Sequence, residues 1–104
     1  MNHVNLIGKM NSAPKFVELA NGRKIAQFTL TTNETYLDAE GNTKSKKQWH
    51  QLSAWGRWVQ VLEELGTAGM GLAIEGKLIN RFYRSTNGEK RVVSEVEVND
   101  LVIL

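Results

Sequence analysis

Apolar and polar residues alternate with a period of two along several segments of the chain. Because successive side chains of an extended strand point to opposite faces, this period predicts strands with one buried face. Five segments show it, at residues 4–10, 24–32, 48–56, 70–83 and 91–99. The chain is therefore expected to consist mainly of β-structure.

The period changes after the third predicted strand. Trp58, Val61, Leu62 and Leu65 occupy positions i, i+3, i+4 and i+7, which form one face of a helix. Gly66 follows at a position where helices commonly end. The pattern predicts one short helix between the third and fourth strands, with Trp58 in the core.

Turn signals separate the predicted strands. Asn21-Gly22 and Asn87-Gly88 are dipeptides typical of tight hairpins. Residues 11–22 are expected to form the exit loop of the first strand, and an extension of the second strand to Tyr36 is an alternative to its end near residue 32. The polar residues 38–47 predict a mobile hairpin tip that carries Lys44, Lys46 and Lys47.

Five strands with a helix between the third and fourth are the pattern of a five-stranded OB-fold, a Greek-key barrel. Gly8, Gly56 and Gly76 stand where tightly coiled strands could bend. With 104 residues and 41% hydrophobic content, the chain is long enough for one core and too short for two. We predict an all-β protein with a single domain over residues 1–104 and a binding face on its second and third strands.

Two tryptophans lie among polar residues on one face of the third predicted strand. Trp49 and Trp55 share this face with Gln51 and Ser53, while the aliphatic Leu52 lies on the other. A wet face with exposed aromatics suits flat ligands, of which unstacked nucleic-acid bases are the commonest. On this segment alone, a strand buried on both faces, or a Trp face that meets another subunit, explains the pattern equally well.

The fourth predicted strand adds cations to the picture. Lys77, Arg81 and Tyr83 fall on one face, opposite the apolar face that contains Leu72 and Ile74. Cations beside an aromatic bind a single strand of nucleic acid through phosphate neutralisation and base stacking. One such strand is usually only a solvated face, but the two strands together favour nucleic-acid binding.

Charge and composition narrow the remaining possibilities. The formal net charge is only +2, from 13 Lys and Arg against 11 Asp and Glu, so a nucleic-acid site must depend on where the cations lie. No apolar stretch reaches the roughly 18 residues of a membrane span, and the first residues lack the regions of a signal peptide. We expect a cytoplasmic protein without contact to membranes.

Catalytic and metal-binding residues are not expected. The chain contains no cysteine, which excludes disulfides, thiolate catalysis and cysteine metal sites. His3 and His50 are far apart with no carboxylate at ligand spacing, and Glu63-Glu64 is most simply a solvated helix face. We therefore expect no metal, no other cofactor and no enzymatic activity.

Sequence motifs along essentially the whole chain resemble those of the bacterial-type single-stranded DNA-binding proteins. They are Asn5-Leu6-Ile7-Gly8, Gln48-Trp49-His50, Ala54-Trp55-Gly56, Ile74-Glu75-Gly76-Lys77-Leu78 and Glu95-Val96-Glu97-Val98. The resemblance implies an OB-fold that forms a homotetramer in the bacterial cytoplasm, associated with the nucleoid. Such a protein wraps and protects single-stranded DNA during replication, recombination and repair, without strong sequence preference.

The resemblance also assigns roles to individual residues. It places base stacking at Tyr36, Trp49, Trp55 and Tyr83, and a subunit contact at His50. The lysines of the predicted hairpin tip either form a plain solvated turn or bind phosphate. We favour phosphate contact because the tip is expected to lie beside the Trp face. The predicted phosphate contacts are Lys44, Lys46, Lys47, Arg57, Lys77, Arg81 and Arg84.

Members of this family usually continue into a flexible tail with an acidic tip that recruits replication and repair enzymes. The given sequence stops at Asp100-Leu101-Val102-Ile103-Leu104, so recruitment through such a tail is not expected. Two other function classes stay open at this point. One is a tail-less, dimeric primosomal protein of replication restart whose face partly docks protein. The other is a nuclease or other enzyme, which a magnesium-dependent cleavage assay would expose.

Overall fold

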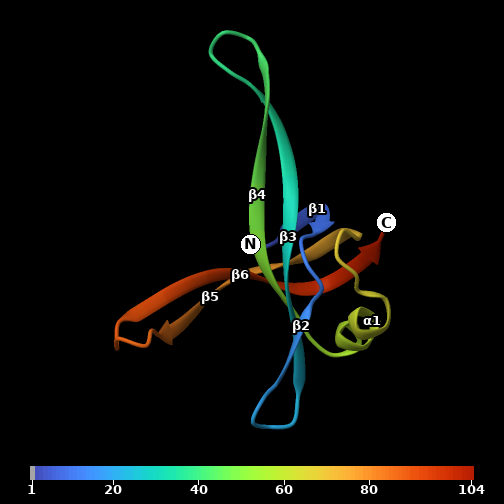
Figure 1. Ribbon diagram of the computed structural model, residues 1–104, viewed down its shortest axis with the longest axis vertical. Coiled ribbons are helices and arrows are strands. Elements are labelled where there is room, and N and C mark those ends of the chain that lie inside the picture. The colour runs from blue at the N-terminus through green and yellow to red at the C-terminus, as the bar shows by residue number, and fades with distance from the viewer. Residues whose placement is uncertain (1) are drawn as a thin grey trace.

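The computed structural model describes residues 2–104, except for the side chain of Tyr83. It contains six strands and one helix (Figure 1). In chain order these are β1 (Val4–Met10), β2 (Lys15–Glu18), β3 (Lys24–Leu37), β4 (Thr43–Ala54), α1 (Arg57–Leu65), β5 (Gly71–Arg84) and β6 (Lys90–Ile103).

Five of the strands close into a barrel. Their order is β1-β5-β6-β4-β3, and an additional pairing of β1 with β3 completes the circle. The contact between β4 and β6 is parallel, at Leu52 opposite Val96 and Ser53 opposite Glu97, whereas the other pairs are antiparallel. This arrangement, with α1 between β4 and β5, confirms the predicted all-β OB-fold barrel.

The barrel interior is filled by the alternate residues that the sequence pattern assigned to it. Leu30, Leu52 and Leu72 are fully buried, and Leu62 of α1 packs with them in the same core cluster. Strand glycines let the backbones approach closely: a Cβ at Gly76 would collide with the carbonyl oxygen of Glu97 on β6. Such close approach gives the strong coiling that a five-stranded barrel needs.

Two long hairpins leave the barrel (Figure 1). In the β3–β4 hairpin, Asp38 Oδ1 accepts hydrogen bonds from the backbone N–H groups of Glu40 and Asn42, at 3.0 and 2.8 Å. In the β5–β6 hairpin, the backbone N–H of Ser85 donates to the carbonyl of Glu89 at 2.8 Å. The two hairpins point in different directions, so each presents most of its surface to solvent.

Several sequence-based boundaries were wrong. Residues 11–22 are not all loop, because β2 lies within them and pairs with the first residues of β3. β3 continues through Tyr36, and β4 begins at Thr43, so the hairpin lysines lie on a strand and not in the turn. The sequence left the extension through Tyr36 as an alternative and missed the early start of β4, because polar residues that pair outside a core have no hydrophobic period.

The face of β4 that was expected to be wet is only partly so. Ser53 is fully buried, because this end of β4 pairs with β3 on one side and with β6 on the other. Trp55 comes after the last residue of β4 and is half-buried. Trp49 and Gln51 are the part of that face which solvent reaches.

Candidate nucleic-acid interface

Trp49 is the most accessible tryptophan of the barrel wall. It lies on β4 opposite Thr31 of β3, and 62% of its surface is exposed. Two residues further along β4, Gln51 accepts a 3.4 Å hydrogen bond from Thr29. A large flat ring held among small polar side chains on a rigid strand is suited to stacking with a base.

The β3–β4 hairpin carries aromatic and cationic residues on both of its faces. Tyr36 lies directly opposite Lys44, so these two side chains share one face, and Tyr36 is half-exposed. Lys47 lies two residues from Trp49 along β4 and shares the other face. The hairpin therefore pairs an aromatic with a cation on each face, and Lys46 adds a second exposed cation to the face of Tyr36 and Lys44.

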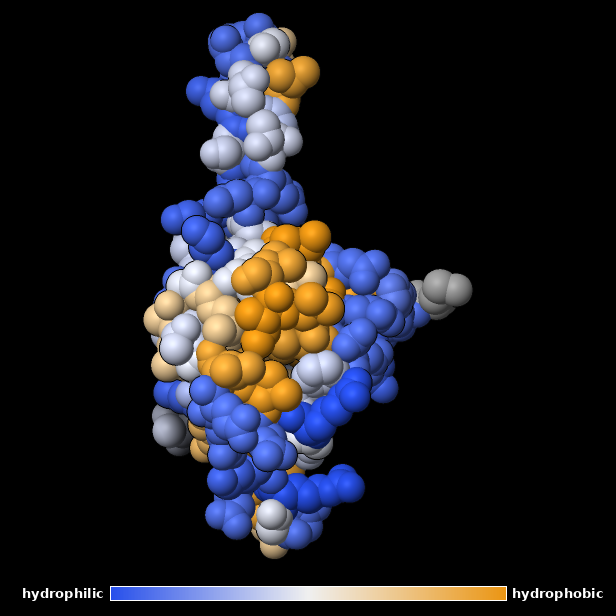
Figure 2. Space-filling model, turned by 90° about the vertical axis from the view of Figure 1, so that its right-hand side faces the viewer, coloured by the Kyte–Doolittle hydropathy of each residue, from blue (hydrophilic) through white to orange (hydrophobic). Residues whose placement is uncertain are grey.

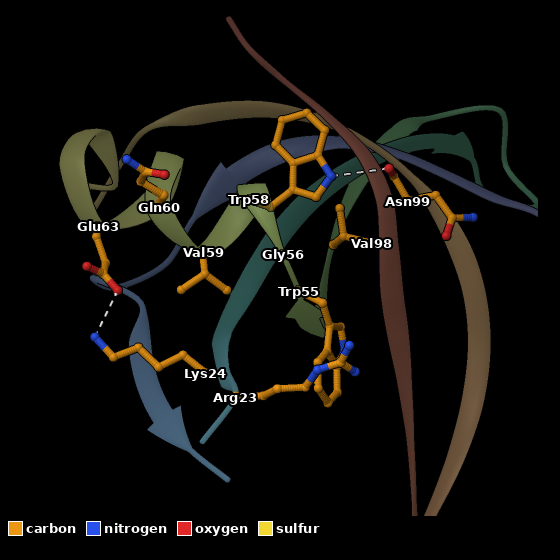
Figure 3. A pocket seen from close by; sticks show the side chains of 10 residues that line it. All are labelled: Arg23, Lys24, Trp55, Gly56, Trp58, Val59, Gln60, Glu63, Val98 and Asn99. Atoms are coloured by element: carbon orange, nitrogen blue, oxygen red, sulfur yellow. Dashed lines mark hydrogen bonds and ion pairs between the residues drawn. The ribbon is translucent and has the colours of Figure 1, made fainter. Parts of the chain in front are cut away.

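Trp55 lies at the point where β4 passes into α1. It lines a pocket of about 600 Å3 together with Arg23, Trp58 and Asn99 (Figure 3). The indole Nε1 of Trp55 is buried with no hydrogen-bond partner in the part of the chain that the structure describes. Trp58 packs against the core, as predicted, but it is only half-buried because its other side lines this pocket.

Two polar interactions fix the pocket's far wall. Trp58 Nε1 donates a 3.2 Å hydrogen bond to the backbone carbonyl of Asn99, which ties α1 to β6 (Figure 3). The guanidinium of Arg57 lies 4.4 Å from the centroid of the Trp58 ring, a cation–π distance. Arg57, a predicted phosphate contact, is thus held beside the pocket at the start of α1.

Two of the predicted phosphate contacts on β5 are already paired with carboxylates of β6. Arg81 donates to Glu95 Oε1 from Nη2 at 2.8 Å and from Nε at 3.2 Å, and Glu95 is only 5% exposed. Lys77 Nζ lies 3.6 Å from Glu97 Oε1. The sequence pattern of one strand could not show these pairs, since both acids come from a neighbouring strand.

The end of the β5–β6 hairpin contains an aromatic that the sequence reasoning missed. Phe82 is 62% exposed, lies opposite Val92, and has Lys90 Nζ 5.7 Å from its ring centroid. Parity along the strand would have found it as an exposed aromatic on the face opposite Tyr83. The side chain of Tyr83 lies outside the described part of the structure, and Arg84 is exposed on the same hairpin.

His50 is half-buried on the core side of β4. Its Nε2 lies 3.0 Å from Thr32 Oγ1 on β3, within hydrogen-bond distance. Within residues 2–104, apart from the Tyr83 side chain, no cluster of His, Cys, Asp and Glu is arranged to hold a metal ion. Across the same residues, no helix has the length and apolar character needed to cross a membrane.

A closed OB barrel with exposed aromatics and cations on its strands and hairpins is typical of proteins that bind single-stranded nucleic acids. The chain belongs to the single-strand binding protein family, whose model matches residues 1–104. This family is defined by strand binding and not by a catalytic activity.

One curated relative and two solved structures are similar to this chain. The chain is 31% identical over 105 aligned residues to single-stranded DNA-binding protein 1 of Chlorobaculum tepidum, and it spans 65% of that relative's length. It superimposes with a TM-score of 0.92 and 27% identity on a Plasmodium falciparum SSB in complex with ssDNA, covering 100% of this chain and 95% of the other. The fold is shared with a deletion mutant of the single-stranded DNA binding protein from Thermus aquaticus. That structure is 24% identical to this chain with a TM-score of 0.89, and this chain covers half of it.

Proposed function

We propose that this chain binds single-stranded DNA without sequence preference and protects it during replication, recombination and repair. The observation that carries the proposal is the exposed Trp49 ring on the barrel wall, flanked by a hairpin with Tyr36 and three lysines. Each stacked base contributes about 1–3 kcal/mol, and stacking tolerates any sequence because every base has a π-face. Membership of the single-strand binding protein family supports the same ligand.

The described contacts rank the phosphate-binding residues. Lys77 and Arg81 are expected to contribute little, because their charges are matched by Glu97 and Glu95. Phosphate contact is expected from the exposed cations Lys44, Lys46, Lys47, Arg57 and Arg84, with stacking on Tyr36, Trp49, Trp55, Tyr83 and the additional Phe82. The protein acts by binding alone, without chemistry on the strand, in the bacterial cytoplasm at the nucleoid.

Assembly into a homotetramer is part of the proposal, with residues 1–104 as one DNA-binding domain in each subunit. One OB groove holds only about 4–16 nucleotides, so wrapping a longer strand needs several copies. An apolar row crosses the outer face of three strands, where Ile7 lies opposite Ala73 and Ala73 opposite Val102. Leu104 continues this exposed area, and Figure 2 shows apolar surface gathered on the side where the C-terminal end of the chain lies.

This apolar surface supports a contact between copies, because large exposed apolar areas of soluble proteins commonly mark association sites. We propose that His50 lies near a second subunit contact, as the family resemblance implies. Its half-buried position on β4 is compatible with that role.

Titration with poly-thymidine while following Trp fluorescence tests the proposed function. Binding should quench the emission, and Trp49→Ala should weaken binding by about 1–3 kcal/mol without loss of the fold. The log of the affinity should fall linearly with log salt, by about 0.7 for each phosphate contact. A salt-independent association, or equal affinity of Trp49→Ala and the native chain, would contradict the proposal.

A further inference from the structure

A pocket extends from the end of the Trp-bearing strand across the start of α1. Its walls come from the β2–β3 turn, the junction of β4 with α1, and β6 (Figure 3). Trp55 and Trp58 contribute two indoles, and Val98 adds an aliphatic surface between them and the core. The pocket volume of about 600 Å3 lies in the range of small-molecule sites and leaves room for one nucleotide.

The two adjacent cations at the rim of this pocket differ in their partners. Lys24 Nζ lies 3.3 Å from Glu63 Oε1, so its charge is matched by a carboxylate of α1 (Figure 3). Arg23, the residue before it, forms no ion pair with any side chain that the structure describes. Arg57 lies next to the pocket with its guanidinium on the Trp58 ring. It too forms no ion pair with a carboxylate among the side chains that the structure describes. Arg23 therefore lines the pocket with a charge that can bind a phosphate, whereas Arg57 is not part of the pocket lining.

We propose that this pocket binds one nucleotide of the DNA strand that leaves Trp55. The base lies against Trp55 and the pocket wall formed by Trp58 and Val98, and the phosphate lies against Arg23. The inference rests on the proposed function, because it extends the path of the same strand from β4 over the start of α1. Trp58 is then both a core residue and part of the DNA site.

A nucleotide fits this pocket better than an acidic peptide does. An indole wall beside a cation matches the two parts of a nucleotide, which are a flat base and a phosphate one sugar away. The pocket also begins at Trp55, one of the proposed stacking positions, so a strand stacked there can continue into it.

Two measurements on the full chain test the inference. The first compares the salt dependence of poly-thymidine binding by Arg23→Gln and Lys24→Gln, which remove the same charge at adjacent positions. Arg23→Gln should make the slope of log affinity against log salt shallower by about 0.7 for each subunit that the strand crosses. Lys24→Gln should leave the slope unchanged, because Glu63 already neutralises this lysine.

The second measurement uses Trp58 as its own reporter. The chain has three tryptophans, so Trp49→Phe with Trp55→Phe leaves Trp58 as the single fluorophore. Saturating poly-thymidine should quench this emission, a change that a purely structural tryptophan would not show. Circular dichroism of each variant verifies that the fold is retained.

The outcomes separate this inference from the proposed function. If the native chain binds poly-thymidine but Arg23→Gln keeps the native salt slope, or if Trp58 emission stays constant at saturation, the pocket is not part of the DNA path. The proposed function would stand in that case. If the native chain itself shows no binding, the proposed function fails, and the inference fails with it.

Discussion

Arg81→Met separates a structural role of Arg81 from the phosphate contact that the sequence predicted. The substitution keeps a long apolar stem but removes the guanidinium, so Glu95 loses both of its hydrogen bonds from Arg81. Because Glu95 is 5% exposed, it would remain as a nearly buried charge without its partner. We expect the main effect on the free energy of unfolding and little effect on the DNA affinity.

The size of the effect lies between two known limits. Removing one partner of a fully buried ion pair costs about 3–5 kcal/mol, whereas exposed pairs contribute at most about 1 kcal/mol. The Arg81 side chain is 43% exposed, so water can reach the carboxylate once the guanidinium is gone. We expect a loss of about 2 kcal/mol in stability, and most of it should return in the double variant with Glu95→Gln, which removes the buried charge.

Urea denaturation at one fixed protein concentration measures this loss, since oligomer stability depends on concentration. Lys77→Met is the matched control: its pair with Glu97 is longer and more exposed, so the change should stay below about 1 kcal/mol. Arg84→Met is the binding control and should make the salt slope shallower with native stability. Native stability of Arg81→Met together with a shallower salt slope would refute the reasoning.

Three further predictions concern packing, assembly and stacking. Gly76→Ala should lower the free energy of unfolding in urea denaturation by about 1–3 kcal/mol or more, because the added Cβ would strike the β6 backbone. Gly88→Ala is the control: it has open space around it and a φ of 84°, so it should lower the free energy of unfolding by only about 1–2 kcal/mol. Ile7→Asp should dissociate the proposed homotetramer in light scattering, whereas Leu37→Asp, equally exposed on a hairpin, should not. A tetramer that survives Ile7→Asp would exclude this face as the interface. Phe82→Ala should weaken poly-thymidine binding by roughly 1–3 kcal/mol in a fluorescence titration, and unchanged affinity would remove Phe82 from the site.

The hydrophobic period of the sequence could predict the strands and the helix that form the barrel itself. β1 begins and ends where the alternation of Val4, Leu6 and Met10 does, and α1 ends where Gly66 donates its N–H to the carbonyl of Leu62. In both cases the residues of the local pattern are also the residues that pack in the core, so a single segment of the sequence is enough to predict the bounds of the element. β2 and the outer half of β3–β4 pair without burying a face, and the local pattern is silent there.

The sequence could predict those parts of the site that depend on a single residue and its place on one strand. Strand parity among polar neighbours favoured the exposure of Trp49, which is 62% exposed, but the same parity placed the buried Ser53 on that face. The pairing of Arg81 with Glu95 depends on the β5–β6 register, and the pocket beside Trp58 depends on how α1 sits against β6. Such contacts join residues from different elements, so no single segment could have revealed them.

The distribution of ion pairs explains how a chain with a net charge of only +2 can bind a polyanion. On the barrel-proximal part of β5, Lys77 and Arg81 are matched by acids of β6, so this surface is nearly neutral. The exposed lysines of β4 and the arginines beside α1 have no carboxylate within ion-pair distance among the described side chains. Positive potential therefore gathers where the exposed aromatics are. Because phosphate binding releases counterions only at unmatched cations, the salt dependence should arise from the two hairpins and the pocket beside α1, and not from the barrel wall.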